Sequence, residues 1–502
     1  MAYAAAMPES PAALVAPPPP GPRRHRHAGR RHGAIGLLPA LLLSMAGAVS
    51  AAAVLAPPDL IQRQDAGWWI ARWPGADRIV LDRDGVTATN ARLFAQDPAL
   101  VRLDTLPDTL PDTLPDTLPG DAIATRIEAL SRPPSSPRWF ADGRAVTPGD
   151  IARWTAALDL AVLAGRSQAL GWALVTRRAA LRTFPTDEAI FSDPIERDLD
   201  RLQESALFPG TPVAVLHASA DGRWRFVQAA TYVAWVRDDA LAHAPRATVL
   251  GYAARATRVV TAAEARLATS PDAPVLSGLV LDMGTTLPER RGVDPALVVN
   301  GQAAMGNPVV ELPVRTSTGR LAIAPALLPR SEASHDGPLP ASRANVLRQA
   351  FRFLGERYGW GHGLDGRDCS GFVSEVYRSV GLWLPRNTRD QAGSPAFSRT
   401  AIAADLPRDA RLALLRRLAP GDLVYLPGHV VMVVGHDADG PWVIHDVHRT
   451  QVPDGRGGLA EVAINGVAVT PLLPLHTSDG RPYIDVLTAI QQVLPPEPEA
   501  AP

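Results

Sequence analysis

Residues 358–372 read YGWGHGLDGRDCSGF and contain Cys369, the only cysteine among 502 residues. A chain with one cysteine forms no internal disulfide, so the thiol serves either packing or reactivity. Four glycines make a flexible approach to it: Gly359, Gly361, Gly363 and Gly366. Asp368 is a favourable N-cap, and apolar residues then recur at helical spacing from Phe372 to Val380, before Gly381. The pattern predicts that Cys369 lies in the first turn of a buried helix.

In the first turn of a helix, unpaired backbone N–H groups and the positive end of the dipole favour a thiolate, which is the nucleophilic form of cysteine. The alternative is that a lone cysteine is a small core hydrophobe. A glycine-rich entry followed by Asp-Cys-Ser at a helix start exposes a side chain rather than burying it. We therefore interpret Cys369 as a nucleophile.

A cysteine nucleophile needs a base, which the region after Pro420 can supply. Three short apolar segments follow, at residues 423–426, 429–434 and 442–447, and residues 437–440 form a tight turn between the last two. His429 opens the middle segment and His445 lies in the third. In a hairpin closed at that turn, the numbers of paired residues sum to about 877, so His429 faces the neighbourhood of residue 448 and His445 that of residue 432. One bulge or a small register shift would bring the two imidazoles together on one face of the hairpin. We predict that His429 forms a thiolate–imidazolium pair with Cys369 and that His445 orients His429.

These segments also resemble a known family. YGWGHGLDGRDCSGFVSEVYRSVGLWLPRNTRDQA, PGDLVYLPGHVVMVVG and WVIHD are similar to the NlpC/P60 family of papain-like cysteine peptidases, which cut bacterial cell-wall peptides. The resemblance covers residues 340–490 and implies a Cys-His-His triad at Cys369, His429 and His445. It also implies that Tyr358 contributes to the oxyanion site. His362 departs from the Gly-Gly that is usual after the tryptophan.

Charge composition and the amino-terminal segment indicate the kinds of partner and the cellular location to expect. The 50 basic and 51 acidic residues nearly balance, so no nucleic-acid footprint is indicated. Residues 1–55 carry a cluster of arginines followed by an uncharged apolar run that ends in small residues. This order predicts a secretory signal, or an uncleaved inner-membrane anchor because the run is long enough to span a bilayer. Either outcome places the protein outside the cytoplasm, in the periplasm or cell envelope.

The rest of the chain reads as smaller modules. Residues 56–194 are interpreted as a linker and helical cap. DTLP is repeated four times between Leu103 and Pro119, and this repeat is interpreted as an exposed linker. Short strands and tight turns predict a first small barrel at 195–265 and a second at 268–335, and the first resembles a bacterial SH3-like domain. Residues 491–502 read as a disordered tail. The predicted fold class is α+β: a papain-like catalytic domain preceded by a helical cap and two SH3-like barrels.

The function implied by the resemblance is a cysteine endopeptidase acting on peptidoglycan stem peptides, at the bond between γ-D-glutamate and the diamino acid, without a cofactor. One alternative is a wall-binding protein whose peptidase fold is inert, and another is an amidase or transferase that uses the same triad. A third is a metal site, because histidines crowd the hairpin: His429, His436, His445 and His448. No HExxH or CxxC spacing supports this third alternative, and we predict no metal.

The order of barrels and peptidase resembles the dipeptidyl-peptidase-like branch of the same family. In that branch the first barrel closes one end of the cleft, which implies a preference for peptides with a free amino-terminal L-alanine. The substrate-binding positions then fall on Asp368, Ser370 and Thr388, with Tyr232 as the aromatic cap from the barrel. Asp368 is expected to supply the negative charge that a free ammonium group needs.

Overall fold

The computed structural model describes residues 54–55, 57–106 and 117–495. The predicted signal or anchor over residues 1–55 lies almost wholly outside the described residues, as do the centre of the DTLP repeat and residues 496–502. Within the described ranges, no helix is both long enough and apolar enough to cross a membrane.

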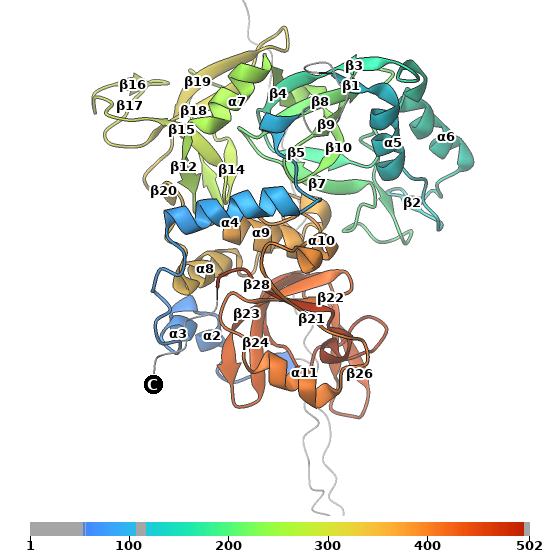
Figure 1. Ribbon diagram of the computed structural model, residues 1–502, viewed down its shortest axis with the longest axis vertical. Coiled ribbons are helices and arrows are strands. Elements are labelled where there is room, and N and C mark those ends of the chain that lie inside the picture. Colours follow the sequence, from blue (N-terminus) through green and yellow to red (C-terminus); the bar gives the residue numbers. More distant parts are fainter. Residues whose placement is uncertain (1–53, 56, 107–116, 496–502) are drawn as a thin grey trace, which may run out of the picture. The chain divides into compact units, whose positions relative to one another are not determined.

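The carboxyl-terminal part of the chain is built on a six-stranded antiparallel sheet with strand order β21-β28-β22-β23-β24-β27 (Figure 1). Its strands are β21 (Ser398–Ala401), β22 (Leu423–Leu426), β23 (His429–Asp437), β24 (Gly440–Val447), β27 (Gly466–Pro471) and β28 (Ala489–Gln492). Other elements of this part are α8 (Arg343–Ala350), α9 (Cys369–Ser379), α10 (Thr388–Gly393), α11 (Arg408–Leu415), β25 (Thr450–Pro453) and β26 (Leu459–Val462). The predicted α+β class is confirmed, and so are the three strands predicted between residues 423 and 447.

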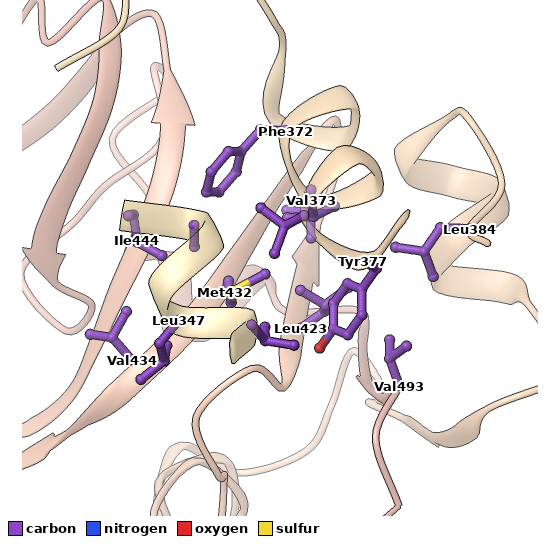
Figure 2. Packing of buried hydrophobic residues seen from close by; sticks show 14 of the residues in the cluster. Leu347, Phe372, Val373, Tyr377, Leu384, Leu423, Met432, Val434, Ile444 and Val493 are labelled. Atoms are coloured by element: carbon purple, nitrogen blue, oxygen red, sulfur yellow. The ribbon is translucent and has the colours of Figure 1, made fainter. Parts of the chain in front are cut away.

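Both faces of this sheet are buried, which explains why β23 is apolar without alternation. Val430, Met432 and Val434 point toward α8 and α9, whereas Val431 and Val433 belong to the core on the opposite face. Figure 2 shows the first of these cores, in which α9 contributes Phe372, Val373 and Tyr377. The amphipathic pattern of α9 thus places the helix start, and Cys369 with it, against the beginning of β23.

The end of the chain is part of the same sheet. β28 pairs with both β21 and β22, and Leu494 is buried in the core. The predicted tail therefore begins too early, because residues 491–494 belong to the fold. The segment rich in proline and glutamate begins at Pro495, directly after Leu494.

A seven-stranded sheet with order β11-β4-β8-β9-β10-β5-β7 forms the first barrel. Its strands are β4 (Gly171–Val175), β5 (Ala179–Arg182), β7 (Gln203–Leu207), β8 (Pro212–Ala218), β9 (Trp224–Gln228), β10 (Val233–Arg237) and β11 (Leu241–His243). The predicted hairpin turn at Asp221-Gly222 is present between β8 and β9. The sheet begins at residue 171 rather than at the predicted boundary of 195, because β4 and β5 pair with strands far along the chain.

The predicted helical cap is part of this barrel's core rather than a separate layer. α5 (Gly120–Leu130) and α6 (Pro148–Ala157) bury Ile127 and Trp154 beside Trp235 of β10. The ends of the DTLP repeat are also ordered: Leu106 is buried, and β1 (Thr117–Pro119) pairs with β3 (Ser167–Ala169). The prediction of an exposed linker is therefore wrong at both described ends of the repeat.

A second, five-stranded sheet has the order β19-β18-β15-β12-β20. Its strands are β12 (Ala256–Val260), β15 (Thr286–Arg290), β18 (Val309–Arg315), β19 (Leu321–Leu327) and β20 (Ser334–Asp336), and α7 (Arg246–Ala254) precedes it. Short two-stranded pairs complete this region and the first barrel: β2 (Trp139–Phe140) with β6 (Ile190–Phe191), β13 (Glu264–Arg266) with β14 (Val280–Asp282), and β16 (Val298–Val299) with β17 (Gln302–Ala303). The sheet starts at residue 256, before the predicted boundary of 268.

Residues 57–82 pack against the carboxyl-terminal sheet, although they come first in the described chain. They contain α2 (Leu60–Arg63) and α3 (Ala66–Ile70), and α4 (Arg83–Gln96) follows. Arg63 forms an ion pair with Asp437 at 2.7 Å. Trp69 is buried against Gly435, where an added Cβ would lie 2.5 Å from the indole ring. This segment is therefore a structural part of the peptidase region and not a linker.

We expect Trp69→Ala to destabilise the carboxyl-terminal region by about 3–5 kcal/mol, because it removes a large, fully buried ring. Trp68→Ala is the matched control: its ring is only half-buried and stacks on Arg72 at 3.4 Å, so its loss should lower the free energy of unfolding by only about 1 kcal/mol. Urea unfolding followed by circular dichroism measures both. Equal losses from the two substitutions would contradict the assignment of Trp69 as the anchor of this segment.

Candidate active site

Cys369 begins α9, as the sequence predicts. The Asp368 carboxylate accepts a hydrogen bond from the N–H of Gly371 at 2.8 Å, so it caps the helix. The thiol is buried, its sulfur lies 3.9 Å from Thr388 Oγ1, and the backbone N–H of Val430 is directed at it. Because Val430 directly follows His429, the thiol lies beside the start of β23.

A bulge in the hairpin brings the two predicted histidines together. Pairing between β23 and β24 runs from Asp437↔Gly440 to Gly435↔Trp442, then shifts by one residue at Val433↔Val443. The shift places His429 and His445 on one face, and Nε2 of His429 lies 2.9 Å from Nδ1 of His445. The structure therefore contains both the predicted bulge and the contact between the two histidines that depends on it.

The hydrogen-bond chain continues to a residue that sequence reasoning missed. Nε2 of His445 lies 3.0 Å from Oγ1 of Thr470, which is buried on β27. If His445 Nε2–H donates to Thr470, then His445 Nδ1 accepts from His429 Nε2–H, and His429 Nδ1 keeps its lone pair. The opposite direction would place a proton on Nδ1 of His429 and leave no base. Only the first tautomer is compatible with general-base action by His429.

Burial sets the charge state of the site. It raises the pKa of the Cys369 thiol to about 12, with the nearby Asp368 carboxylate acting in the same direction. It also lowers the pKa of His429 to about 4 and that of His445 well below its usual value. The predicted effect of the helix start on the thiol is therefore outweighed by burial. Burial therefore disfavours both a lone thiolate at Cys369 and a lone imidazolium at His429.

Two tyrosines lie near the thiol. Tyr358 is buried, and burial together with the proximity of Cys369 raises the pKa of its hydroxyl well above the usual value. Its ring lies 5.9 Å from that of His448. The second tyrosine, Tyr483, was not predicted: its ring lies 6.0 Å from His429 and it is close enough to Cys369 for the thiol to affect its pKa. No local motif marks Tyr483, because it reaches the site from the far end of the domain.

His362, the departure from the family pattern, supports the glycine-rich loop. It has a positive φ of 60°, and its buried ring bonds to Glu375 Oε1 and to Arg386 Nη2, each at 3.0 Å. Arg386 in turn holds both carboxylate oxygens of Asp368, at 2.7 and 3.1 Å. The imidazole thus links the helix interior to the arginine that fixes the N-cap of α9.

This arrangement corrects the prediction for Asp368. Burial opposes its charge, but the Arg386 guanidinium holds the pKa of Asp368 at about 2. Its negative charge is therefore already compensated, so it is not free to pair with a substrate ammonium group. Ser370 is likewise engaged, because its hydroxyl donates to Asp368 and accepts from Arg386. Thr388 differs from Asp368 and Ser370, because its hydroxyl contacts the Cys369 sulfur.

The first barrel supplies a carboxylate that was not predicted. Tyr232, predicted as the aromatic cap, donates from its hydroxyl to Glu204 Oε2 at 2.5 Å, and the Thr183 hydroxyl donates to Oε1 at 2.6 Å. Glu204 lies on β7, whose Gln203 side chain donates to the carbonyl of Gly361 at 2.8 Å. The half-buried Glu204 carboxylate thus has neutral partners. Its strand contacts the glycine-rich loop that leads to Cys369.

A buried ionic cluster fixes the loop to both barrels. Arg367 donates to Glu375 at 2.6 Å, to Asp282 of β14 at 2.9 Å and to Glu356. Arg178 of the first barrel also pairs with Asp282, at 2.5 Å, and donates to the carbonyls of His362 and Gly366. The position of the loop before Cys369 thus depends on residues from all three parts of the chain.

The hairpin histidines do not converge on a common point. His436 bonds to the Leu418 carbonyl at 2.7 Å, and His448 lies 3.3 Å from Asp198. Among the residues that the structure describes, no group of three or more His, Cys, Asp or Glu side chains has the geometry of a metal site. The arrangement around Cys369 supports chemistry by a thiol and an imidazole.

Comparisons with known proteins agree with these modules. Residues 355–455 match the model of the NlpC/P60 family, and residues 189–237 match that of an SH3 domain of the SH3b1 type. Over 104 residues, or 20% of this chain, the sequence is 31% identical to dipeptidyl-peptidase 6 of Lysinibacillus sphaericus, and the match spans 33% of that protein. An NlpC/P60 endopeptidase from Photobacterium damselae subsp. piscicida has the same fold at a TM-score of 0.65 and 16% identity, over 85% of this chain and 96% of that one.

Thr470→Val should lower kcat/KM about tenfold, because it leaves the buried Nε2–H of His445 without an acceptor and lets the inactive tautomer compete. Thr470→Ser restores the acceptor and should recover most of the activity. Rates are measured from pH 5 to 9, because a misdirected tautomer changes the pH profile whereas a packing defect does not. Thr488→Val, which removes a hydroxyl bonded to the Tyr425 carbonyl, is the control. Equal activities of the Ser and Val variants at position 470 would contradict the tautomer role.

Proposed function

Residues 355–455 form an NlpC/P60 domain, and we propose that this chain is a cysteine endopeptidase that hydrolyses the bond between γ-D-glutamate and the diamino acid of peptidoglycan peptides. The observation that carries the proposal is the hydrogen-bond chain from His429 through His445 to Thr470, which lies beside a cysteine at a helix start. One of the two possible directions of this chain leaves Nδ1 of His429 unprotonated and able to act as a base.

In the proposed mechanism, the Cys369 thiol transfers its proton to Nδ1 of His429 as the sulfur attacks the carbonyl carbon of the scissile amide. The resulting oxyanion accepts hydrogen bonds from the backbone N–H of Cys369 and from the Tyr358 hydroxyl. His429 then protonates the leaving amine, the C–N bond breaks, and a thioester remains on Cys369. Water, deprotonated by His429, attacks the thioester and releases the acid and the thiol. His445 and Thr470 keep the tautomer and ring orientation of His429 throughout.

Cys369→Ser should reduce hydrolysis below detection while leaving the fold intact, because a hydroxyl is far less acidic than a thiol. His429→Ala should be comparably severe, since no other group is in place to take the proton. His445→Gln should be milder, because an amide oxygen can still accept from His429. Mass spectrometry of digested wall peptides reports both the rate and the bond that is cut. Full activity of Cys369→Ser would exclude the thiol mechanism.

The amino-terminal preference rests on Glu204 rather than on Asp368. Asp368 is neutralised by Arg386, whereas the partners of Glu204 among the described residues are the hydroxyls of Tyr232 and Thr183. A carboxylate with neutral partners keeps its charge available for an ammonium group. We therefore propose that Glu204, held by Tyr232, binds the free amino group of an L-alanine at the end of the stem peptide.

Wild-type enzyme should cleave L-Ala-γ-D-Glu-diaminopimelate at least about tenfold faster, as kcat/KM, than the same peptide with an acetylated amino group, because acetylation removes a charge-assisted hydrogen bond. Glu204→Gln should abolish most of that ratio by slowing the free peptide alone. Asp239→Asn, at an exposed carboxylate of the same barrel that pairs with Arg177, should leave the ratio unchanged. Equal rates of the wild type on both peptides would show that the barrel does not close the pocket.

A peptidoglycan substrate also supports export. The arginine cluster before residue 34 and the apolar run that follows have the order of a signal. We propose that the enzyme acts in the periplasm or cell envelope.

A further inference from the structure

A cavity of about 1110 Å³ lies beneath α4, the blue helix in Figure 1, and is bounded by α9 and by both barrels. Cys369, His429 and His445 are not among its lining residues, although Arg386, which binds Asp368, is. Much of its wall is apolar, with contributions from Phe94, Leu207, Phe208, Leu250, Met283 and Trp383. Its volume and its mostly apolar wall are those of a small-molecule site.

The charges that line this cavity do not cancel. Each lining carboxylate is paired with an arginine: Asp104 with Arg102 at 2.6 Å, Asp336 with Arg291 at 2.5 Å, and Glu375 with Arg367 at 2.6 Å. Arg386 is paired with Asp368. Arg378 and the exposed Arg83 also line the cavity, and neither forms an ion pair with any residue that the structure describes. The cavity therefore has an excess of positive charge.

Arg378 is the more enclosed of these two arginines. Its guanidinium lies 3.8 Å from the ring centroid of Trp383, and within the described chain it donates no hydrogen bond. Trp383 is held by α4, because its backbone N–H donates to Oδ1 of Asn90 at 3.1 Å. Burial lowers the pKa of Arg378 to about 10, although the Glu375 carboxylate acts in the opposite direction, so the group stays charged at neutral pH. A guanidinium held in this way has five donors and no acceptor.

A second unpartnered donor lies next to Arg378. The aliphatic part of Arg378 crosses Gly284, where an added Cβ would lie 2.8 Å from its carbons. The next residue, Thr285, lines the cavity with only 6% of its surface exposed, and its Oγ1 is buried without a hydrogen-bond partner among the described residues. Buried hydroxyls are rarely left unpaired, because the lost hydrogen bonds to water are not replaced. The cavity is thus lined by two donors, Arg378 and Thr285, that have no hydrogen-bond acceptor among the described residues.

We propose that this cavity binds a small amphiphilic anion, whose carboxylate or phosphate group accepts hydrogen bonds from Arg378 and Thr285 while its apolar body lies against the wall under α4. The stacked guanidinium and the hydroxyl form a preorganised cradle for oxygen anions. The apolar wall continues from this cradle along Met283 and Leu207. The proposal is independent of the reaction at Cys369.

The test is calorimetric titration of the full chain with decanoate and with decyl phosphate, which distinguish the two head groups, and with decyltrimethylammonium as the cationic control. We expect at least one anion to bind and the cation to bind at least about tenfold more weakly, because the Arg378 guanidinium attracts anions and repels cations. Arg378→Met should weaken binding of the anion roughly tenfold or more, whereas Arg378→Lys should keep most of it. Arg416→Met, at an exposed arginine after α11, should have no effect.

Thr285→Val removes only a hydroxyl and should weaken binding about threefold or more, so it serves as the test if Arg378→Met does not fold. Cys369→Ala should bind the anion as the wild type does, because the thiol lies outside the cavity. Equal binding of anion and cation, wild-type affinity in Arg378→Met, or no heat from either anion up to millimolar concentration would overturn the proposal. Loss of binding in Cys369→Ala would place the ligand in the active site and would also overturn it.

Discussion

The loop before Cys369 depends on one buried cation. Arg367 is fully buried, and its guanidinium is shared among Asp282 of the second barrel region, Glu356 and Glu375. Taking such a charge out of water is unfavourable unless each donor finds a partner, and removing one partner leaves an uncompensated charge. Arg178 adds the first barrel to the same cluster through Asp282. The geometry at the start of α9 is thereby tied to the way the three parts of the chain pack.

The strain in the glycine-rich loop follows from this dependence. Gly361, His362, Leu364 and Asp365 all have positive φ, a conformation that is unfavourable for the three residues with side chains. The bonds of Arg178 to the His362 and Gly366 carbonyls, and those of the His362 ring to Glu375 and Arg386, hold the loop in that shape. The loop ends at Asp368, which caps α9 and accepts hydrogen bonds from Arg386. Support for the nucleophile therefore extends well beyond the peptidase sheet.

Burial disfavours charge on both partners of the proposed reaction. It raises the pKa of the Cys369 thiol and lowers that of the His429 imidazole, so in the proposed mechanism the ion pair forms by transfer of a proton between them. Such a transfer requires that the imidazole present the correct nitrogen, which gives the chain from His429 to Thr470 its importance. A substrate that brings polar groups to the thiolate would favour the charged pair over the neutral one.

The sequence by itself determined the elements and their local order. The cap at Asp368, the helix behind Cys369, the three strands around His429 and His445, and the need for a bulge all follow from patterns within a few residues of one another. Tertiary structure alone decided which charges are free. Asp368 looks like an open carboxylate in sequence and is neutralised by Arg386, 18 residues away. Glu204 reaches the site region from the sheet of the first barrel, and Thr470 reaches it from β27, the strand next to His445 in the same sheet. Local periodicity sets which face a side chain occupies, but pairing between distant strands and burial decide what that side chain meets there.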